Sequence, residues 1–222
     1  MSLPRQAVVV CPACNRSCSI VVWETVNVTL QPNLRTRVMD RSLHSAKCSH
    51  CSTLFEFFAE LFYHDMNRKF MISLVKDEPG KPFIVHPFSA TMAKQMPEHI
   101  LRFVTSYNQL VEKIQIFESG LNDWVIETLK FFLWHKKFPG RVLGNDQMYF
   151  NGIEDEGTRE PKLRFDCFEQ GKSLGRLCPS RTLYEAMWQA GEEKYKRLEI
   201  DGWQLVNQSN IFSGKDETSE KD

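Results

Sequence analysis

Two kinds of hydrophobic periodicity divide the chain. Up to about residue 76, apolar positions alternate with polar ones or form short runs, as in "AVVV" at residues 7–10 and "SIVVWETVNVTL" at residues 19–30. A period of two is typical of half-buried strands, so we expect a set of short β-strands over residues 5–76. In the second run, apart from Glu24, one face collects Ile20, Val22, Val26, Val28 and Leu30.

The period changes to about three and a half after Pro97. The apolar positions from Ile100 to Phe117 predict a helix that begins near Pro97 and ends at Gly120. A second helix is predicted over residues 121–138, and the short connection makes the two helices antiparallel neighbours. Its apolar stripe would comprise Leu121, Trp124, Val125, Thr128, Leu129 and Phe132. Between the β-rich part and these helices, "KDEPGKPF" at residues 76–83 is a linker signal.

The last third of the chain mixes both patterns. "QMYFNGI" and "PKLRFDCFE" predict strands, "TLYEAMWQAGEEKYKRL" predicts a helix, and "WQLVN" resembles a final strand. Thr182 and Glu185 have the spacing of a capping box at the start of that helix. The polar tail "SGKDETSEKD" lacks the apolar surface needed to offset its ordering entropy. The predicted organisation is α+β: a β module at 1–78, a helical hairpin at 79–139, a small α+β unit at 140–208 and a disordered tail at 209–222.

Composition narrows the function classes. The 222 residues are 42% hydrophobic, which supplies a core, and the 28 basic residues equal the 28 acidic ones, so no global charge draws the chain to nucleic acid or anionic lipid. No signal-peptide core and no membrane-spanning run are evident, so we expect a cytoplasmic protein without membrane contact. Seven cysteines, four of them in two Cys-x-x-Cys pairs, favour metal or redox use over a disulfide framework in such a compartment.

The two pairs are Cys11 with Cys14 and Cys48 with Cys51, separated by 33 residues that can form a β insertion returning the chain to the metal. Zn²⁺ prefers four such ligands in a tetrahedron, so the pairs predict one structural Zn²⁺ in a zinc-ribbon-like module. A thioredoxin-like redox centre is less consistent, because it uses one pair ahead of a helix. An iron–sulfur cluster also takes four thiolates, and Cys18 extends the first pair to Cys-x-x-Cys-x-x-x-Cys, so spacing alone does not exclude it.

At this point the chain resembles a known family. "CPAC" with "CSHC", then "FMISLV" and "RFVTSYNQLVEKIQIFESGLNDWVIETLK", are similar to the CpXC-type domain of bacteria and archaea, over roughly residues 7–135. The resemblance implies a zinc-ribbon-like module with an all-cysteine site at Cys11, Cys14, Cys48 and Cys51, followed by helices, and implies no activity. Zinc knuckles often place Gly after the second Cys. Here Asn15, which tolerates positive φ, and Ser52 stand there, so the second knuckle is the less well specified.

Other candidate chemistry is weaker. His64 and Asp65 are adjacent in "YHD", but neighbours near a strand end point apart, and turn residues are usually solvated. Cys167 and Cys178 lack a Cys partner pattern, and a thiol nucleophile needs a base beside it. The cluster "HKKFPGR" at residues 135–141 mixes aromatic and basic residues as nucleic-acid grooves do, but also suits the C-terminal end of a helix.

These observations favour a non-enzymatic, zinc-binding, protein-interaction or adaptor module, because strand edges of a ribbon can be paired by a partner strand. The alternative is an accessory protein linked to nucleic acid or transcription, including prokaryotic defence systems, which rests on fold analogy. The expected contact surface lies around the strand predicted at Arg35 to Arg41 and around the second helix end. Its basic residues are Arg35, Arg37, Arg41, Lys136, Lys137 and Arg141.

Overall fold

The computed structural model describes residues 2–78, 91 and 94–211, and the chain divides into two compact units, Met1–Val111 and Glu112–Asp222. The structure is mixed α+β, which confirms the predicted fold class. Most of the linker predicted at residues 76–83, and the predicted tail from residue 212 onward, lie outside the described residues.

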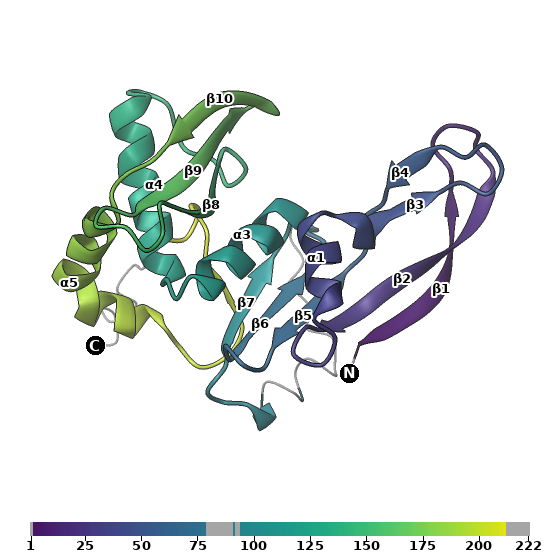
Figure 1. The fold of residues 1–222 in the computed structure, drawn as a ribbon, viewed down its shortest axis with the longest axis horizontal. Helices are drawn as coiled ribbons and strands as arrows, with labels where there is room; N and C mark the ends of the chain where they lie inside the picture. Colours follow the sequence, from purple (N-terminus) through teal and green to yellow (C-terminus); the bar gives the residue numbers. More distant parts are fainter. Residues whose placement is uncertain (1, 79–90, 92–93, 212–222) are drawn as a thin grey trace, which may run out of the picture. The chain divides into compact units, whose positions relative to one another are not determined.

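The first unit contains a sheet in which its strands follow the order β1, β2, β5, β6, β7 (Figure 1). The β1–β2 and β5–β6 pairs are antiparallel, whereas β2–β5 and β6–β7 are parallel. Every residue of β5 and β6 is buried, which explains why these strands show no clear alternation of apolar and polar residues. The strands are β1 Leu3–Val10, β2 Ser17–Asn27, β5 Leu61–Asp65, β6 Phe70–Leu74 and β7 Ile100–Val104.

Two hairpins extend from this sheet and end at the same tip (Figure 1). Because β2 pairs with β5 only from Thr25 to Asn27, the rest of β2 continues outward with β1 alone. We call this two-stranded extension, residues 3–10 and 17–24, the ribbon arm. The second hairpin is formed by β3 (Ser45–Lys47) and β4 (Leu54–Glu56). The two Cys-x-x-Cys segments form the turns of these hairpins.

The predicted facing of β2 is largely confirmed: Ile20, Val22, Val26 and Val28 are buried and Glu24 is exposed. Leu30 was placed wrongly on the buried face, since its side chain is 62% exposed. The strand ends at Asn27, whose side-chain Oδ1 accepts the amides of Thr29 (3.1 Å) and Leu30 (3.1 Å) and turns the chain.

The strand expected around Arg35 to Arg41 is instead the helix α1 (Asn33–Met39), followed by the short 3₁₀ helix η1 (Ser42–His44). Helix α1 buries Leu34 and Val38, which are four residues apart and therefore share one helical face. This i, i+4 pair was the missed signal. Arg41 separates the two helices with a left-handed backbone (φ 64°).

The helix predicted from Pro97 was also wrong at its start. Residues Ile100–Val104 form β7, which pairs parallel with β6, and the helix α3 begins only at Tyr107 and ends at Glu118. A short apolar run cannot be assigned to helix or strand by periodicity alone, and here pairing to a buried strand decides. The true helix start has a capping signal, because the Ser106 hydroxyl accepts the amide of Gln109 at 3.3 Å.

The second unit packs helices with a small antiparallel sheet of order β10, β9, β8. Asn122 caps α4, its side chain accepting the amide of Val125 at 3.2 Å. Phe132, predicted on the buried stripe of α4, is 56% exposed. Strand β10 was missed, because its "GKSLGRL" segment has little alternation. The elements are α4 Asp123–Lys137, β8 Met148–Glu154, β9 Lys162–Glu169, β10 Lys172–Leu177, α5 Arg181–Leu198 and β11 Gln204–Leu205.

The capping box predicted at Thr182 and Glu185 is wrong. The N-cap of α5 is Ser180, which makes no side-chain cap bond, and its hydroxyl lies 2.7 Å from the Thr182 hydroxyl. Glu185 pairs with Arg181 at 3.2 Å instead of reaching back to the cap. The four-residue spacing of this ion pair competes with the capping interaction.

Charged residues are fully buried between α3 and α4. The Lys130 ammonium contacts Glu112 at 3.1 Å and Glu127 at 3.0 Å, and Lys113 contacts Asp123 at 2.9 Å. Each of these five side chains is at most 2% exposed. We call Glu112, Lys113, Asp123, Glu127 and Lys130 the buried ion network. It fixes α3 against α4.

Candidate metal centre

The first Cys-x-x-Cys turn has the hydrogen bonds of a knuckle. The amide of Asn15 donates to the carbonyl of Cys11 at 2.9 Å, and the amide of Cys11 donates to the carbonyl of Arg16 at 3.0 Å. Asn15 has a left-handed backbone with φ 54°, which its short polar side chain tolerates. This turn joins β1 to β2 and places both thiols on its inner side.

The second turn repeats the same geometry 37 residues later. Ser52 donates to Cys48 at 3.0 Å, Cys48 donates to Thr53 at 2.9 Å, and Ser52 has φ 62°. The sequence specified this knuckle less well because Ser rarely adopts positive φ. The same two backbone hydrogen bonds nevertheless close both knuckles, and in the second one Ser52 and Cys48 donate them.

The four sulfurs lie close enough to bind a single ion. The Sγ atoms of Cys11 and Cys51 are 3.7 Å apart, those of Cys14 and Cys48 are also 3.7 Å apart, and all four lie within 4.8 Å of one another. A metal–sulfur bond of about 2.3 Å places the sulfurs of a regular tetrahedron about 3.8 Å apart. The spacing therefore matches a mononuclear tetrahedral site, and all four cysteines are free of disulfides.

Local hydrogen bonds prepare some of these thiols to lose their protons. The Thr53 hydroxyl, 3.3 Å from the sulfur of Cys51, and the Thr53 amide lower the pKa of Cys51 to about 6. The backbone amides of Cys51 and His50 lower the pKa of Cys48. The amide of Arg16 lowers the pKa of Cys14, but burial and the neighbouring thiols outweigh it and raise that pKa to about 12. A cation would resolve this conflict, because it stabilises all four thiolates together.

The site is covered on one side only. Cys11 and Cys48 are buried, Cys14 is half-buried and Cys51 is exposed. Cys18 and Phe55 complete the buried cluster. Four thiolates around one ion leave no open coordination position, so such a site stabilises structure and cannot activate water or substrate.

Neither neighbouring candidate ligand belongs to the four-sulfur group. Cys18 is buried, and its thiol faces the carbonyl of Val9 at 3.6 Å. The Nε2 atom of His50 lies 3.1 Å from the carbonyl of Ser17, which ties the second knuckle to the strand that follows the first. The sequence reasoning missed this contact and the role of Thr53, because neither has a recognisable spacing signal.

The predicted basic residues are distributed over both units. Arg35 and Arg37 are half-buried on α1, and Arg41 lies near Glu56, at 3.8 Å, and over the Tyr107 ring. In the second unit, the last turn of α4 contains the exposed Lys136 and Lys137, and Arg141 pairs with Glu169 at 2.8 Å. Trp134, which directly precedes this cluster in the sequence, is fully buried. The structure does not bring these six residues together within one unit.

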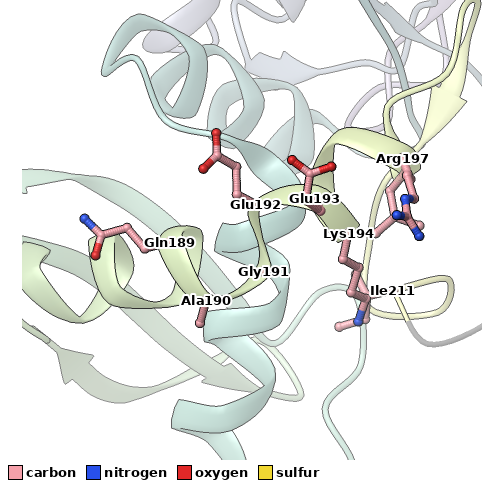
Figure 2. Close-up of a pocket in the computed structure, with 9 residues that line it drawn as sticks. Gln189, Ala190, Gly191, Glu192, Glu193, Lys194, Arg197 and Ile211 are labelled. Atoms are coloured by element: carbon pink, nitrogen blue, oxygen red, sulfur yellow. The ribbon is translucent and has the colours of Figure 1, made fainter.

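The other candidate residues lie in separate parts of the structure. His64 and Asp65 are buried in β5, contrary to the solvated turn expected, and Asp65 pairs with Arg68 at 2.9 Å. Cys167 is buried and Cys178 is exposed. A hollow of about 710 Å³ follows α5, but Figure 2 shows Gln189 pointing away from Lys194 and Arg197, so its polar side chains do not converge.

Comparison with known proteins places the chain in a family. Residues 9–130 match the CpXC protein family, and this range covers the cysteine centre, helix α3 and the first half of α4. The chain therefore belongs to the CpXC family. No curated protein and no solved structure matches it. In the described part of the chain, no helix is both long enough and apolar enough to cross a membrane.

Proposed function

We propose that the four cysteines bind one structural Zn²⁺ and that the protein acts as a non-enzymatic interaction module. The observation that carries this proposal is the pair of matching knuckles, whose four sulfurs have the spacing of a single tetrahedral ion. Zn²⁺ is the ion of choice because it accepts thiolates without redox chemistry and has no preference against a tetrahedron.

The sulfur spacing also separates zinc from an iron–sulfur cluster. In a cluster with several irons, the four thiolates are divided among different irons, so thiolates on different irons lie further apart than in a tetrahedron around one ion. A single iron would fit the same spacing, and metal analysis distinguishes it. The closed four-cysteine shell supports a structural role for the metal, so we place function on the protein surface.

The test is metal analysis of the full chain purified without chelators, followed by affinity capture from the native cell. We expect close to one zinc per chain and recovery of a protein partner. Iron in place of zinc, or no metal, would contradict the zinc assignment. Salt-sensitive binding to DNA or RNA by the same preparation would favour the nucleic-acid alternative over the adaptor role.

A further inference from the structure

The outer strand of the ribbon arm has an open edge. In the described part of the first unit, β1 pairs with β2 and with no other strand, and Figure 1 shows β1 on the outside of the arm. All eight residues of β1 are exposed or half-buried. Long exposed edges invite pairing with another chain, and natural proteins usually block them with charges, prolines or bulges.

The backbone direction along this edge follows from the knuckle. The amide of Cys11 donates to Arg16, and in an antiparallel ladder the residues that face the partner strand alternate. The backbone amides and carbonyls of Val9, Ala7 and Arg5 therefore point toward β2. The amides and carbonyls of Gln6, Val8 and Val10 point outward, and Pro4, with the same orientation, offers no amide. The open edge that can pair thus runs from Gln6 to Val10.

The side chains on this part of the arm are uncharged, and apart from Gln6 those of β1 are apolar. Val8 is 73% exposed and Val10 is 62% exposed, and on the same face Val21 of β2 is 48% exposed. Their cross-strand neighbours on that face are Ser17 and Ser19. The single charge of β1, Arg5, lies on the opposite face, where it pairs with Glu24 at 2.5 Å. The segment from Gln6 to Val10 therefore has no charged side chain that would block pairing with another strand.

We propose that this edge pairs antiparallel with the same edge of a second copy of the chain, with Val8 opposite Val8 of that copy. In this register Gln6 lies opposite Val10 of the second copy, so the outward amides and carbonyls of all three residues are bonded in both chains. Pro4 falls opposite Pro12, beyond the end of the strand, so the ladder loses no bond at a proline. The arrangement has the two-fold symmetry of the commonest protein dimers.

Charge complementarity selects this occupant. The same register places Arg5 opposite Cys11 of the second copy, and both side chains project from the same face of the sheet. Four thiolates with one divalent cation have two net negative charges, so each metal centre would attract the guanidinium of the other chain. This step rests on the proposed zinc site. The contact is short, so we expect a weak, concentration-dependent dimer.

The experiment is sedimentation velocity of the zinc-loaded full chain in reducing buffer, from a few micromolar to several hundred micromolar. We expect the mass to rise from 25.9 kDa toward twice that value. Val8→Pro removes an outward amide and leaves the β1–β2 ladder intact, so dimerisation should weaken at least tenfold. Val8→Lys keeps the amide and places two like charges on the symmetry axis, with the same expected loss. Val21→Ser, on β2, is the matched control and should dimerise like the wild type.

Zinc content, measured on every sample, separates the two proposals. If the wild type binds one zinc but stays monomeric at all concentrations, the dimer proposal is overturned and the zinc proposal stands. The same holds if the Val8→Lys variant keeps its zinc and dimerises like the wild type. Loss of dimer in Val21→Ser but in neither Val8 variant would also overturn the dimer proposal, since the contact would then be the face of the arm. A chain without zinc overturns the proposed function whatever its mass.

Discussion

The two units differ in what holds their least apolar regions together: a cysteine cluster that can bind a metal in the first unit, and buried ion pairs in the second. Each contains a region in which a hydrophobic core alone does not fix the geometry: the ribbon arm and its neighbouring hairpin in the first unit, and the α3–α4 contact in the second. At the arm tip the buried cluster comprises only Cys11, Cys18, Cys48 and Phe55. Between α3 and α4 five charged side chains are buried.

Under the proposed function the first region depends on an ion from outside the chain, whereas the second contains its own charges. Burial raises the pKa of Glu112, which opposes its ionisation. Burial alone would lower the pKa of Lys130, but Glu112 and Glu127 outweigh it and raise that pKa. Three carboxylates thus surround two ammonium groups, and Glu112 also accepts the amide of Phe150 at 2.7 Å.

The comparison concerns specificity as much as stability. A buried ion network is often no more stable than an apolar core of the same shape, but breaking it is costly, so it excludes alternative packings of α3 on α4. A structural metal adds stability outright and makes folding depend on ligand protonation and metal supply. The first unit should therefore respond to solution conditions, and the second should respond to substitutions.

Loss of the metal should have the largest effect. Structural zinc contributes about 10–16 kcal/mol in small modules, comparable with the roughly 5–15 kcal/mol that stabilises a whole domain. Cys11→Ser should lose the metal and the amide protection of the ribbon arm, while β9 in the second unit keeps its protection. Hydrogen exchange with metal analysis measures both. Cys18→Ser, Cys167→Ser and Cys178→Ser are the controls and should retain the metal. Metal loss in Cys18→Ser with retention in Cys14→Ser would show that the ligand set is different.

Disruption of the ion network should be the next largest effect and should spare the metal. Lys130→Met leaves Glu112 buried without its paired cation and leaves Glu127 with Lys113 alone, at 3.5 Å, which should cost about 3–5 kcal/mol. Arg5→Met removes a cation from a half-exposed pair and should cost less than about 1 kcal/mol. Urea denaturation gives both free energies of unfolding. Equal costs for the two variants would show that the network contributes no more than a surface pair.

Acidification should weaken the first unit through two histidines. Burial lowers the pKa of His44 and of His64 to about 4, below their ordinary value near 6.5. The unfolded chain then binds more protons between these values, so the stabilisation is present above about pH 6.5 and falls as the pH drops toward 4. At about 1.4 kcal/mol per pKa unit, we expect a loss of up to about 3 kcal/mol for each histidine across that window.

The variant His44→Phe with His64→Phe separates this effect from metal loss in acid. Phenylalanine preserves ring packing, such as the contact of His44 with Tyr107 at 4.9 Å, and cannot be protonated. Its free energy of unfolding should change less with pH than that of the wild type at equal metal content. An unchanged pH slope would assign the acid sensitivity to the thiolates alone.

The sequence predicted those features that depend on local pattern. Cys-x-x-Cys spacing is local, so it identified the four cysteines that the structure brings together, and a period of two located β2. Strand β7 was missed because its state depends on pairing with β6, far away in the sequence. Helix α1 has a local signal, the i, i+4 pair of Leu34 and Val38, but two apolar positions are too few to stand out. The ion network was missed for a related reason. Glu112 and Lys113 look like a solvated helix face, and nothing local shows that Asp123, Glu127 and Lys130 will bury them.

The smallest effect is expected for the charges at the end of α4, which belong neither to the metal centre nor to the buried ion network. Lys136 and Lys137 are exposed, and Arg141 makes a half-exposed pair with Glu169. Replacing all three with Glu should therefore change the free energy of unfolding by only about 0.5–1 kcal/mol.

The same variant tests the nucleic-acid alternative, because contacts to phosphate give binding that weakens steeply with salt. Fluorescence anisotropy with labelled DNA and RNA at low ionic strength measures this. Under the adaptor proposal the wild type shows no salt-sensitive binding. Wild-type binding that the triple variant loses would assign the surface to nucleic acid and leave the metal and the ion network as its scaffold.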